Sequence, residues 1–158
     1  MNFEMWLAQV PSSITNDPLW RTTVYRQALF VGDLSWHDTR KLVKDHSLIS
    51  LADQLYRAMG SISANIAEGY SRASGKDQAR FYEYALGSAR ESRDWYFKAR
   101  HSLGVTVTEH RMNFLAEIIR QLSKMVPKYR GKSIKEESII YETTPISDLL
   151  QNVPISEA

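Results

Sequence analysis

Mostly apolar residues recur at alternating intervals of three and four along two stretches of this chain. In the first stretch these positions are Leu55, Ala58, Ile62, Asn65 and Gly69. In the second they are Met112, Leu115, Ile119, Leu122 and Val126. Because an α-helix turns once in about 3.6 residues, this spacing places the side chains on one face that a partner helix can cover. The pattern predicts long amphipathic helices and is incompatible with strands, whose side chains alternate with a period of two.

Start signals place two helices in the first half of the chain. Asp17-Pro18 has the form of an N-cap followed by proline at the first helical position, and it predicts a helix from Pro18 to about Lys44. Gly32 favours a bend or a break in the middle of that helix. The helix that carries the first apolar stripe is expected over about residues 50–71.

Two further helices are expected in the second half. Ser74, followed three residues later by Asp77, fits an N-cap pattern and predicts a helix that ends at Gly104. The last long helix is expected to begin at a threonine cap and to close at Pro127. The candidate caps are Thr106 and Thr108.

Four amphipathic helices with short connections predict an all-α fold, specifically an antiparallel up-down-up-down four-helix bundle. We assign residues 1–17 to an N-terminal extension, 18–130 to the bundle and 131–158 to an acidic C-terminal tail. Pro145 and Pro154 argue against helix in the tail. Two apolar runs predict that the tail docks onto the body rather than drifting freely. They are Ile139-Ile140-Tyr141 and Leu149-Leu150.

Composition and charge exclude several classes of protein. The absence of cysteine excludes a disulfide framework and thiolate metal sites, and it is compatible with the cytoplasm, where we expect the protein. No apolar run approaches the roughly 20 residues of a membrane span, so we expect no membrane partner. The net charge of +2 divides into −3 from residue 131 onward and +5 on residues 1–130. A mildly basic body is compatible with nucleic-acid contact and equally with an ordinary solvated surface.

Motifs of known enzyme and metal sites are missing from the sequence. No glutamate has a histidine three residues later, as a di-metal helix bundle requires. The four histidines show no paired helical spacing, and there is no glycine-rich phosphate loop or nucleophile elbow. We therefore predict a protein that is not an enzyme and that uses no metal and no cofactor.

Asn65, Glu68 and Glu91 form a candidate polar group. An amide and a carboxylate one helical turn apart can polarise a substrate, which leaves an enzyme of unrecognised type as a weaker alternative. The favoured interpretation is structural, with Asn65 and Glu68 bonding across to Ser88 and Glu91 and so fixing the register of two helices. Arg72, one turn after Glu68, is the expected counter-ion.

Basic residues gather around the expected third helix and the loop before it. They are Arg72, Lys76, Arg80, Arg90, Arg93, Lys98 and Arg100, with Tyr82, Tyr84, Trp95 and Tyr96 between them. Cations that contact phosphates and aromatic rings that stack on bases would look like this, and so would a helix with a solvated outer face. The candidate nucleic-acid-binding residues are Arg72, Lys76, Arg80, Arg90 and Arg93.

A longer pattern runs through the two central helices. The segment Ile62 to Gly69 reads Ile-x-x-Asn-Ile-Ala-Glu-Gly. The pattern continues at Arg72, Ser74, Lys76, Asp77, Arg80, Phe81, Ala85, Gly87, Ser88 and Glu91. Together these positions resemble the bacterial four helix bundle family, which includes proteins encoded by intervening sequences within 23S ribosomal RNA genes. The family's first-helix pattern Val-Trp-Gln-x-Ala is met loosely, with Tyr25 in place of the tryptophan and Arg26 in place of the glutamine.

The resemblance covers about residues 24–128 and implies a bundle that forms a ring-like homo-oligomer, typically a pentamer. It gives a structural role to Ile62, Asn65, Glu68, Gly69, Phe81, Gly87, Ser88 and Glu91. More distant relatives, the accessory variability proteins of retroelements, bind nucleic acid and a reverse transcriptase. The family branch resembled most closely has no established biochemical activity, so the resemblance implies no mechanism.

Self-association is also expected from the residues. Tyr25, Phe30 and Trp36 fall on differing faces of the first helix, and one bundle cannot easily bury all three. We therefore predict a non-enzymatic homo-oligomer with an RNA- or DNA-binding role in association with the ribosome or a retroelement. The alternative is a protein-interaction scaffold with no nucleic-acid role.

Overall fold

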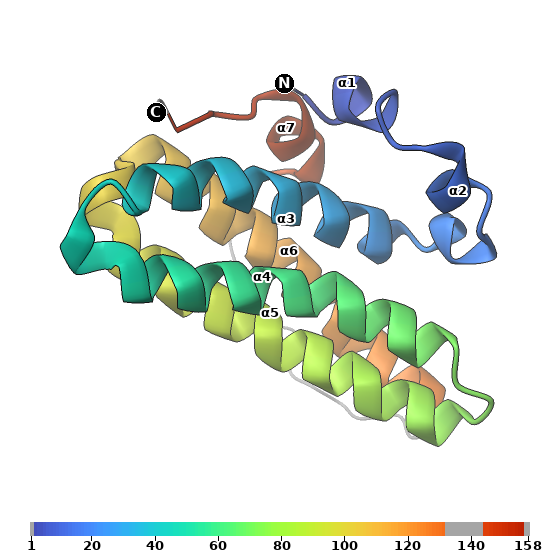
Figure 1. Cartoon of the computed structure of the whole chain (residues 1–158). Helices are drawn as coiled ribbons and strands as arrows, with labels where there is room; N and C mark the ends of the chain where they lie inside the picture. Colours follow the sequence, from blue (N-terminus) through green and yellow to red (C-terminus); the bar gives the residue numbers. More distant parts are fainter. Residues whose placement is uncertain (1, 132–143, 157–158) are drawn as a thin grey trace.

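Helices make up the ordered elements of the protein in a computed structural model that describes residues 2–131 and 144–156 (Figure 1). In chain order they are α1 (Phe3–Leu7), α2 (Ser12–Thr15), the 3-10 helix η1 (Pro18–Arg21), α3 (Thr23–Leu42), the 3-10 helix η2 (His46–Leu48), α4 (Ile49–Tyr70), α5 (Gly75–Leu103), α6 (Val105–Arg130) and α7 (Ile146–Gln151). No strand occurs in these two ranges, so the predicted all-helical class is confirmed there.

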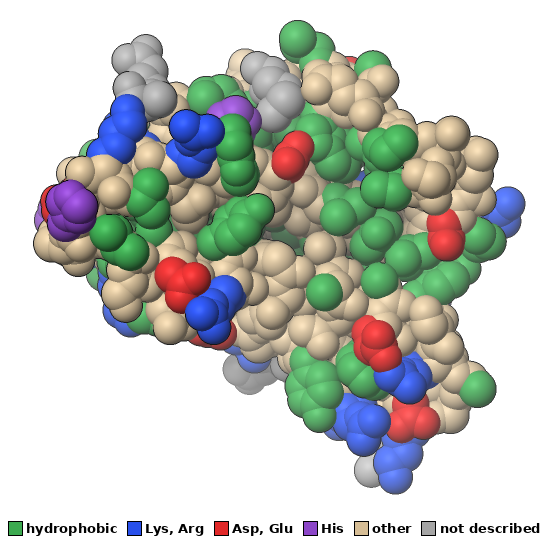
Figure 2. Space-filling view, viewed as in Figure 1, with side chains coloured by type: hydrophobic (Ala, Val, Ile, Leu, Met, Phe, Trp, Pro, Cys, Tyr) green, Lys and Arg blue, Asp and Glu red, His purple; other side chains and the backbone are tan. Residues whose placement is uncertain are grey.

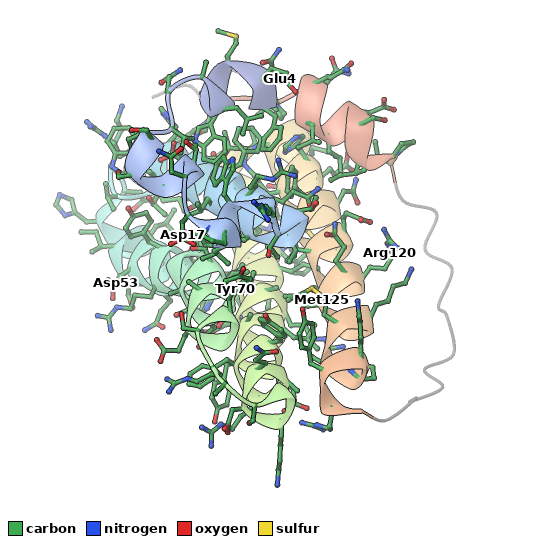
Figure 3. The ribbon with its side chains drawn as sticks, turned by 90° about the vertical axis from the view of Figure 1, so that its right-hand side faces the viewer. Glu4, Asp17, Asp53, Tyr70, Arg120 and Met125 are labelled. Atoms are coloured by element: carbon green, nitrogen blue, oxygen red, sulfur yellow. The ribbon has the colours of Figure 1, made fainter. Side chains whose placement is uncertain are left out.

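The four long helices α3, α4, α5 and α6 lie side by side. Each packs against the next one in the sequence, and α6 also contacts α3. The short helices α1 and α7 lie on one side of the long helices in two views taken 90° apart (Figures 1 and 3). The N-terminal and C-terminal segments therefore cover the same side of the molecule, over α3 and α6.

The core is built from the apolar faces of all four long helices. Side chains at its centre are fully buried, as shown by Phe30, Leu34, Leu55, Ile62 and Phe114. The aromatic part of the core extends into the N-terminal segment, where the Trp6 ring lies 5.3 Å from that of Phe30. The apolar stripe predicted on the second helix is thus confirmed at Leu55 and Ile62.

Gly69 lets α4 and α5 approach closely. A Cβ atom at this position would lie 2.8 Å from Cε1 of Tyr82 and 3.0 Å from Cβ of Phe81. Real Cβ atoms do not come that close, and the Cβ of Phe81 is fixed by its backbone. The last residue of the Ile-x-x-Asn-Ile-Ala-Glu-Gly segment is therefore a steric requirement of this helix pair.

The first predicted helix is divided. Asp17 caps as expected, with its carboxylate accepting from the Leu19 amide at 2.8 Å, but the element that follows is the short η1. The break lies at Thr22, whose backbone is extended, and α3 then runs without interruption through Gly32. The break that Gly32 makes possible does not occur there; the chain turns before α3 instead, where Leu19 is buried.

The connection between α5 and α6 consists of Gly104. Ser74 caps α5 as predicted, accepting from the Asp77 amide at 3.1 Å. Gly104 has φ of 86°, which L side chains rarely adopt, and it serves both as the C-cap of α5 and as the N-cap of α6. The predicted threonine cap was wrong, because this one-residue reversal puts Thr106 and Thr108 inside α6.

Two prolines behave differently from expectation. The helix α6 continues past Pro127 and ends at Arg130, with the Gly131 amide bonded to the Pro127 carbonyl. Pro145 precedes α7, so the tail does contain a short helix. Leu149 in that helix is buried, which confirms docking of this part of the tail. The run Ile139–Tyr141 lies outside the described residues.

Within the part of the chain that the structure describes, no helix is both long enough and apolar enough to cross a membrane.

Candidate nucleic-acid interface

Three of the predicted basic residues meet where α4 ends and α5 begins. Arg72 follows α4, pairs with Glu68 and places its guanidinium carbon 4.5 Å from the centre of the Phe81 ring. Arg80, one turn into α5, lies 5.5 Å from the same ring and 3.8 Å from the Asp77 carboxylate. Phe81 is therefore contacted by two arginines, an arrangement that cation–π attraction stabilises.

A shallow pocket lies at this end of the molecule. It is lined by Lys76, Asp77, Arg80, Glu83 and Arg130, and Arg130 pairs with Glu83 across from α6 to α5. Lys76 forms no ion pair with any residue that the structure describes. Figure 2 shows cationic and acidic side chains interleaved at this end, in the lower right of the view.

A second basic group continues along α5. Arg90, Arg93, Phe97 and Arg100 follow one another at intervals of three and four, so they share one flank of the helix. Phe97 is 50% exposed, and the Arg100 guanidinium carbon lies 4.1 Å from the centre of its ring. None of these three arginines takes part in an ion pair among the described residues.

The second group lies on the flank of α5 that borders α6, whereas Arg72 pairs with Glu68 of α4 and contacts Phe81, which packs against α4. Glu83, Arg90 and Phe97 are seven residues apart and therefore share a side of the helix, and Glu83 is held by Arg130 of α6. From Lys76 to Arg90 the helix rises by about 21 Å. The structure thus brings Arg72, Lys76 and Arg80 together and places Arg90 and Arg93 as a separate group further along. We call Lys76, Arg90, Arg93 and Arg100, with Phe97, the basic flank of α5.

The acidic residues of α5 make other contacts. Glu91 accepts from the Trp95 indole nitrogen at 3.2 Å, and Asp94 accepts from Lys98 at 2.6 Å. Of the aromatic residues proposed to stack on bases, Tyr82 and Tyr96 are fully buried and cannot do so. That part of the sequence prediction was wrong, because these two rings belong to the core face of α5.

The polar group of the family-like segment does not bridge the two helices. Asn65 donates from Nδ2 to the Ser61 carbonyl at 2.8 Å, and Ser88 donates to the Tyr84 carbonyl at 3.0 Å. Glu68 pairs with Arg72, as expected, but remains exposed. The predicted bonds across to Ser88 and Glu91 were wrong, because close packing at Gly69 leaves this group beside the helix seam rather than inside it.

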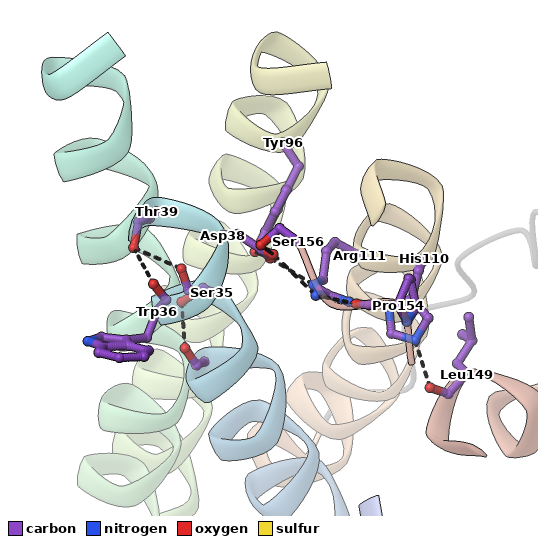
Figure 4. Close-up of polar contacts among 11 residues, drawn as sticks. Ser35, Trp36, Asp38, Thr39, Tyr96, His110, Arg111, Leu149, Pro154 and Ser156 are labelled. Carbon is purple, nitrogen blue, oxygen red and sulfur yellow. Dashed lines mark hydrogen bonds and ion pairs between the residues drawn. The ribbon is translucent and has the colours of Figure 1, made fainter. Parts of the chain in front are cut away.

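A buried polar cluster links α3, α5 and α6 (Figure 4). Asp38 and Arg111 form an ion pair in which both side chains are 0% exposed. Oδ2 of Asp38 accepts from Arg111 Nε at 2.8 Å and from the Tyr96 hydroxyl at 2.8 Å. Oδ1 accepts from Arg111 Nη2 at 3.2 Å and from the Ser156 hydroxyl at 2.9 Å.

His110 extends the cluster toward the tail. Arg111 can only donate, so its 2.8 Å bond to Nδ1 of His110 makes that nitrogen the acceptor. The proton of the neutral ring is therefore on Nε2, which donates to the Leu149 carbonyl at 2.7 Å. Burial, with a contribution from the Arg111 charge, lowers the pKa of His110 to about 4, so the ring is neutral at pH 7.

The carboxylate of Asp38 is fully used by hydrogen bonds within the cluster. Each carboxylate oxygen of Asp38 already accepts two hydrogen bonds, and Arg111 spends a further donor on the Pro154 carbonyl at 2.8 Å. Burial and the neighbouring carboxylate raise the pKa of Tyr96 well above its ordinary value, which keeps the phenol protonated as a donor. The arrangement joins α3, α5 and α6 to the tail.

Sequence reasoning missed this cluster, although one signal was available. Asp38 stands four residues after Leu34 and four before Leu42, in the middle of an apolar row. A charge at such a position requires a buried partner. Nothing local indicates that this partner is Arg111, which lies 73 residues further along the chain.

No group of three or more histidine, cysteine, aspartate or glutamate side chains is placed to hold a metal ion in the described ranges.

Comparison with known proteins places the chain in a family. Residues 22–128 match the model of the 23S rRNA-intervening sequence protein family. A solved structure of a protein of unknown function from the S23 ribosomal protein family of Bacteroides thetaiotaomicron is similar, with a TM-score of 0.62 and 23% identity. The match covers 66% of this chain and 98% of that one, and at this identity it speaks for the fold alone. The search of curated proteins finds no match. The chain therefore belongs to the 23S rRNA-intervening sequence protein family.

Proposed function

We propose that this protein is a non-enzymatic assembly of antiparallel four-helix bundles, closed into a ring, that binds RNA or DNA through the basic flank of α5. The observation that carries the proposal is a row of three arginines, Arg90, Arg93 and Arg100, which have no ion-pair partner among the described residues and lie beside the exposed Phe97. The family name supports association with ribosomal RNA or the ribosome. The up-down-up-down order is supported by the contacts of each long helix with the next and of α3 with α6.

The basic flank suits phosphate contact. Arg90, Arg93 and Arg100 are available to neutralise phosphates without first giving up a carboxylate partner among the described residues, and Lys76 extends the row. Phe97, half exposed and already contacted by a guanidinium, offers a ring face or edge to an unpaired base. Such contacts bind without marked sequence preference and weaken steeply with salt.

An exposed apolar face supports self-association. On α3 and α4 the large exposed side chains recur at multiples of seven residues, so they form one row on each helix. They are Trp36 (44% exposed), Val43 (45%), Ile49 (46%), Tyr56 (49%) and Tyr70 (40%). Figure 2 shows hydrophobic side chains over this face, which we call the α3/α4 face. Rows of exposed large apolar side chains support an interface on this face, and family resemblance favours five copies.

The two parts of the proposal reinforce each other. Residues 1–130 carry +5 per chain and the tail carries −3. A ring repeats the basic flank in every copy, which raises affinity for a long polyanion through multiple simultaneous contacts. The division into residues 1–17, 18–130 and 131–158 stays a prediction, as does the assignment of the site residues.

The test is an electrophoretic mobility shift at low salt with structured RNA, single-stranded RNA and duplex DNA. We expect the wild-type protein to retard these nucleic acids. The triple variant Arg90→Glu, Arg93→Glu, Arg100→Glu should not retard them. A second triple variant, Arg72→Glu, Lys76→Glu, Arg80→Glu, tests the group at the start of α5 in the same way. The replaced side chains make only surface contacts, among them ion pairs and ring contacts of Arg72, Arg80 and Arg100. Circular dichroism and light scattering must show an unchanged fold and oligomeric mass for each variant.

A matched control carries the same change of charge elsewhere. It is the triple variant Lys41→Glu, Lys44→Glu, Arg57→Glu. Lys41 lies in α3, Lys44 follows the end of α3 and Arg57 lies in α4, so none of the three changes is on α5. Because Lys44 and Arg57 adjoin Val43 and Tyr56 of the α3/α4 face, the comparison requires that light scattering show an unchanged oligomeric mass. We expect this variant to retain most of the binding. If all three triple variants lose binding equally, net charge alone governs the interaction and the flank has no special role.

A protein-interaction scaffold without a nucleic-acid role is the second candidate, and the α3/α4 face favours it. Absence of retardation by a wild-type protein of intact oligomeric mass, at tens of micromolar (the order of ordinary non-specific binding), would make the scaffold the better interpretation.

A further inference from the structure

The tail residues 144–156 are held against α3 and α6 by a set of specific contacts (Figure 4). His110 donates to the Leu149 carbonyl at 2.7 Å and Arg111 donates to the Pro154 carbonyl at 2.8 Å. Asp38 accepts from the Ser156 hydroxyl at 2.9 Å. Leu149 is 4% exposed and is the apolar anchor of the segment.

These contacts have the character of peptide recognition. The body supplies fixed donors to two main-chain carbonyls, a carboxylate to one hydroxyl and an apolar site to one leucine. The donors and the acceptor are themselves held by the Asp38–Arg111 pair and by Tyr96, so they are in place before the segment arrives. The solved relative matches this chain over 98% of its own length, but that match covers only 66% of this chain. A related bundle therefore folds without most of the segments that this chain has in addition.

The stretch of chain between Arg130 and Thr144 is longer than the distance that it has to cross. Thr144 lies next to Asn113 of α6, with Oγ1 and Nδ2 3.5 Å apart. Asn113 precedes Arg130 by 17 residues, a distance of about 26 Å along the helix. The connection from Arg130 to Thr144 can reach about 46 Å when extended. The connection is therefore about 20 Å longer than the span that it crosses within one chain.

We propose that the surface between α3 and α6 that residues 144–156 cover, called the groove from here on, binds this segment as a peptide, and that a neighbouring copy supplies the segment in the assembled protein. The second half of the proposal rests on the self-association proposed above. A closed assembly holds the segment of one copy near the groove of the next, where effective concentrations reach the millimolar range. The contacts described here serve equally well between two copies.

Cross-linking between two single-cysteine variants tests the exchange, because the natural chain has no cysteine. Asn113→Cys is made in one preparation and Thr144→Cys in another, and the two are mixed, unfolded, refolded together and oxidised. Exchange predicts a disulfide-linked dimer on a non-reducing gel. Each variant alone and the pair Asp53→Cys with Thr144→Cys serve as controls, because Asp53 lies on α4, away from the groove. The double variant Asn113→Cys, Thr144→Cys reports contact within one chain.

Cross-linking only within the double variant, by a protein that light scattering shows to be oligomeric, would overturn the exchange. A monomeric mass would instead refute the proposed assembly, and the exchange with it. The groove itself is then still tested by the peptide experiment below, so the two failures can be told apart.

Binding of a synthetic peptide tests the groove directly. The receptor is the full chain with Leu149→Asp, which disables the resident segment, and the probe is a fluorescent peptide of residues 144–158. We expect saturable binding that weakens at least tenfold when the peptide carries Leu149→Asp or Ser156→Ala. A peptide with Asn152→Ala, at an exposed position, should bind like the natural one.

Should the Leu149→Asp chain lose its helical circular dichroism, the Ser156→Ala chain takes its place as receptor. Equal binding of all four peptides, or no saturable binding by a folded receptor, would show that the segment is an integral part of the fold and not a ligand of a groove.

Discussion

At the scale of single residues, the Asp38–Arg111 pair dominates the chemistry of the interior. Both side chains are excluded from water, and each is satisfied by several partners. Removing two charges from water is expensive, so a buried pair contributes little net stability, whereas losing one partner leaves an uncompensated charge. The pair therefore makes the docking of α3, α6 and the tail specific more than it makes it strong.

We expect Asp38→Ala to lower the free energy of unfolding by about 3–5 kcal/mol, because Arg111 is left buried without its counter-ion. The double variant Asp38→Leu, Arg111→Met removes both charges and should recover most of that loss. Urea denaturation followed by circular dichroism measures both. A double variant less stable than Asp38→Ala would mean that the pair itself supplies the stability.

His110 makes folding stability depend on pH. Its pKa is lowered from 6.5 to about 4 in the folded protein, so the unfolded chain binds the proton first as the pH falls. The stabilisation is present above about pH 6.5 and is lost progressively toward pH 4, by about 3 kcal/mol in total. Protonation of Nδ1 would also break the hydrogen bond that His110 accepts from Arg111 and would place two positive charges side by side.

The comparison of wild type with His110→Gln isolates this contribution, since all other titrating groups remain. Between pH 7 and pH 4.5 the free energy of unfolding should fall more steeply for the wild type. Parallel curves for the two proteins would mean that His110 is not held neutral in the folded state.

At the scale of elements, the pairing of α4 with α5 depends on Gly69. The close approach of Tyr82 and Phe81 leaves no room for a side chain, and the Phe81 Cβ cannot rotate away. The polar residues of the same segment lie beside this contact and bond within their own helices. In this segment, Gly69 is therefore the residue on which the packing of α4 against α5 depends.

Gly69→Ala should destabilise the protein by about 1–3 kcal/mol, the range for forcing extra atoms into a packed contact. Gly60→Ala is the matched control, since it lies in the same helix and a Cβ there meets no atom within 4 Å. That change should raise stability by up to about 1 kcal/mol through helix propensity. Thermal unfolding of both variants measures these changes in stability. Equal changes would show that Gly69 does not lie at a close contact between α4 and α5.

Local signals in the sequence were sufficient for the long helices and for some of their ends. The caps Asp17 and Ser74 and the glycine at 104 act through neighbouring backbone, so a single sequence reveals them. The break at Thr22 and the Asp38–Arg111 pair depend on packing between distant segments. Periodicity cannot show which charge on one helix meets which on another, and it places Asn65 near a seam without showing how close the helices come.

The same limit applies to the candidate interface. The sequence could group Arg72, Lys76 and Arg80, because a short loop keeps them together. Spacing also put Arg90 and Arg93 on one helix side. Which flank that is follows from the contact of Glu83 with Arg130 of α6. That Phe97 is exposed beside the arginines is known only from the packing of the folded chain.

At the scale of the whole molecule, three features occupy different sides. The apolar residues lie on the α3/α4 face, the basic flank lies where α5 borders α6, and the docked tail covers α3 and α6. A ring joins the α3/α4 face of each copy to a different surface of the next copy. The basic flank is accessible in the ring when that second surface is not on α5. If both proposals hold, self-association and nucleic-acid binding are separable by mutation but coupled in affinity.

Trp36→Glu with Tyr56→Glu tests this coupling, because it places two charges in the middle of the α3/α4 face. Both side chains are close to half exposed, so the fold should survive with unchanged helical circular dichroism. We expect light scattering to show the 18.2 kDa monomer. The monomer should bind long RNA at least tenfold more weakly than the assembly and a short oligonucleotide about equally, since multivalency serves only a ligand that spans several copies. An unchanged oligomeric mass would move the interface to another face, and unchanged affinity for long RNA in a true monomer would show that one basic flank suffices.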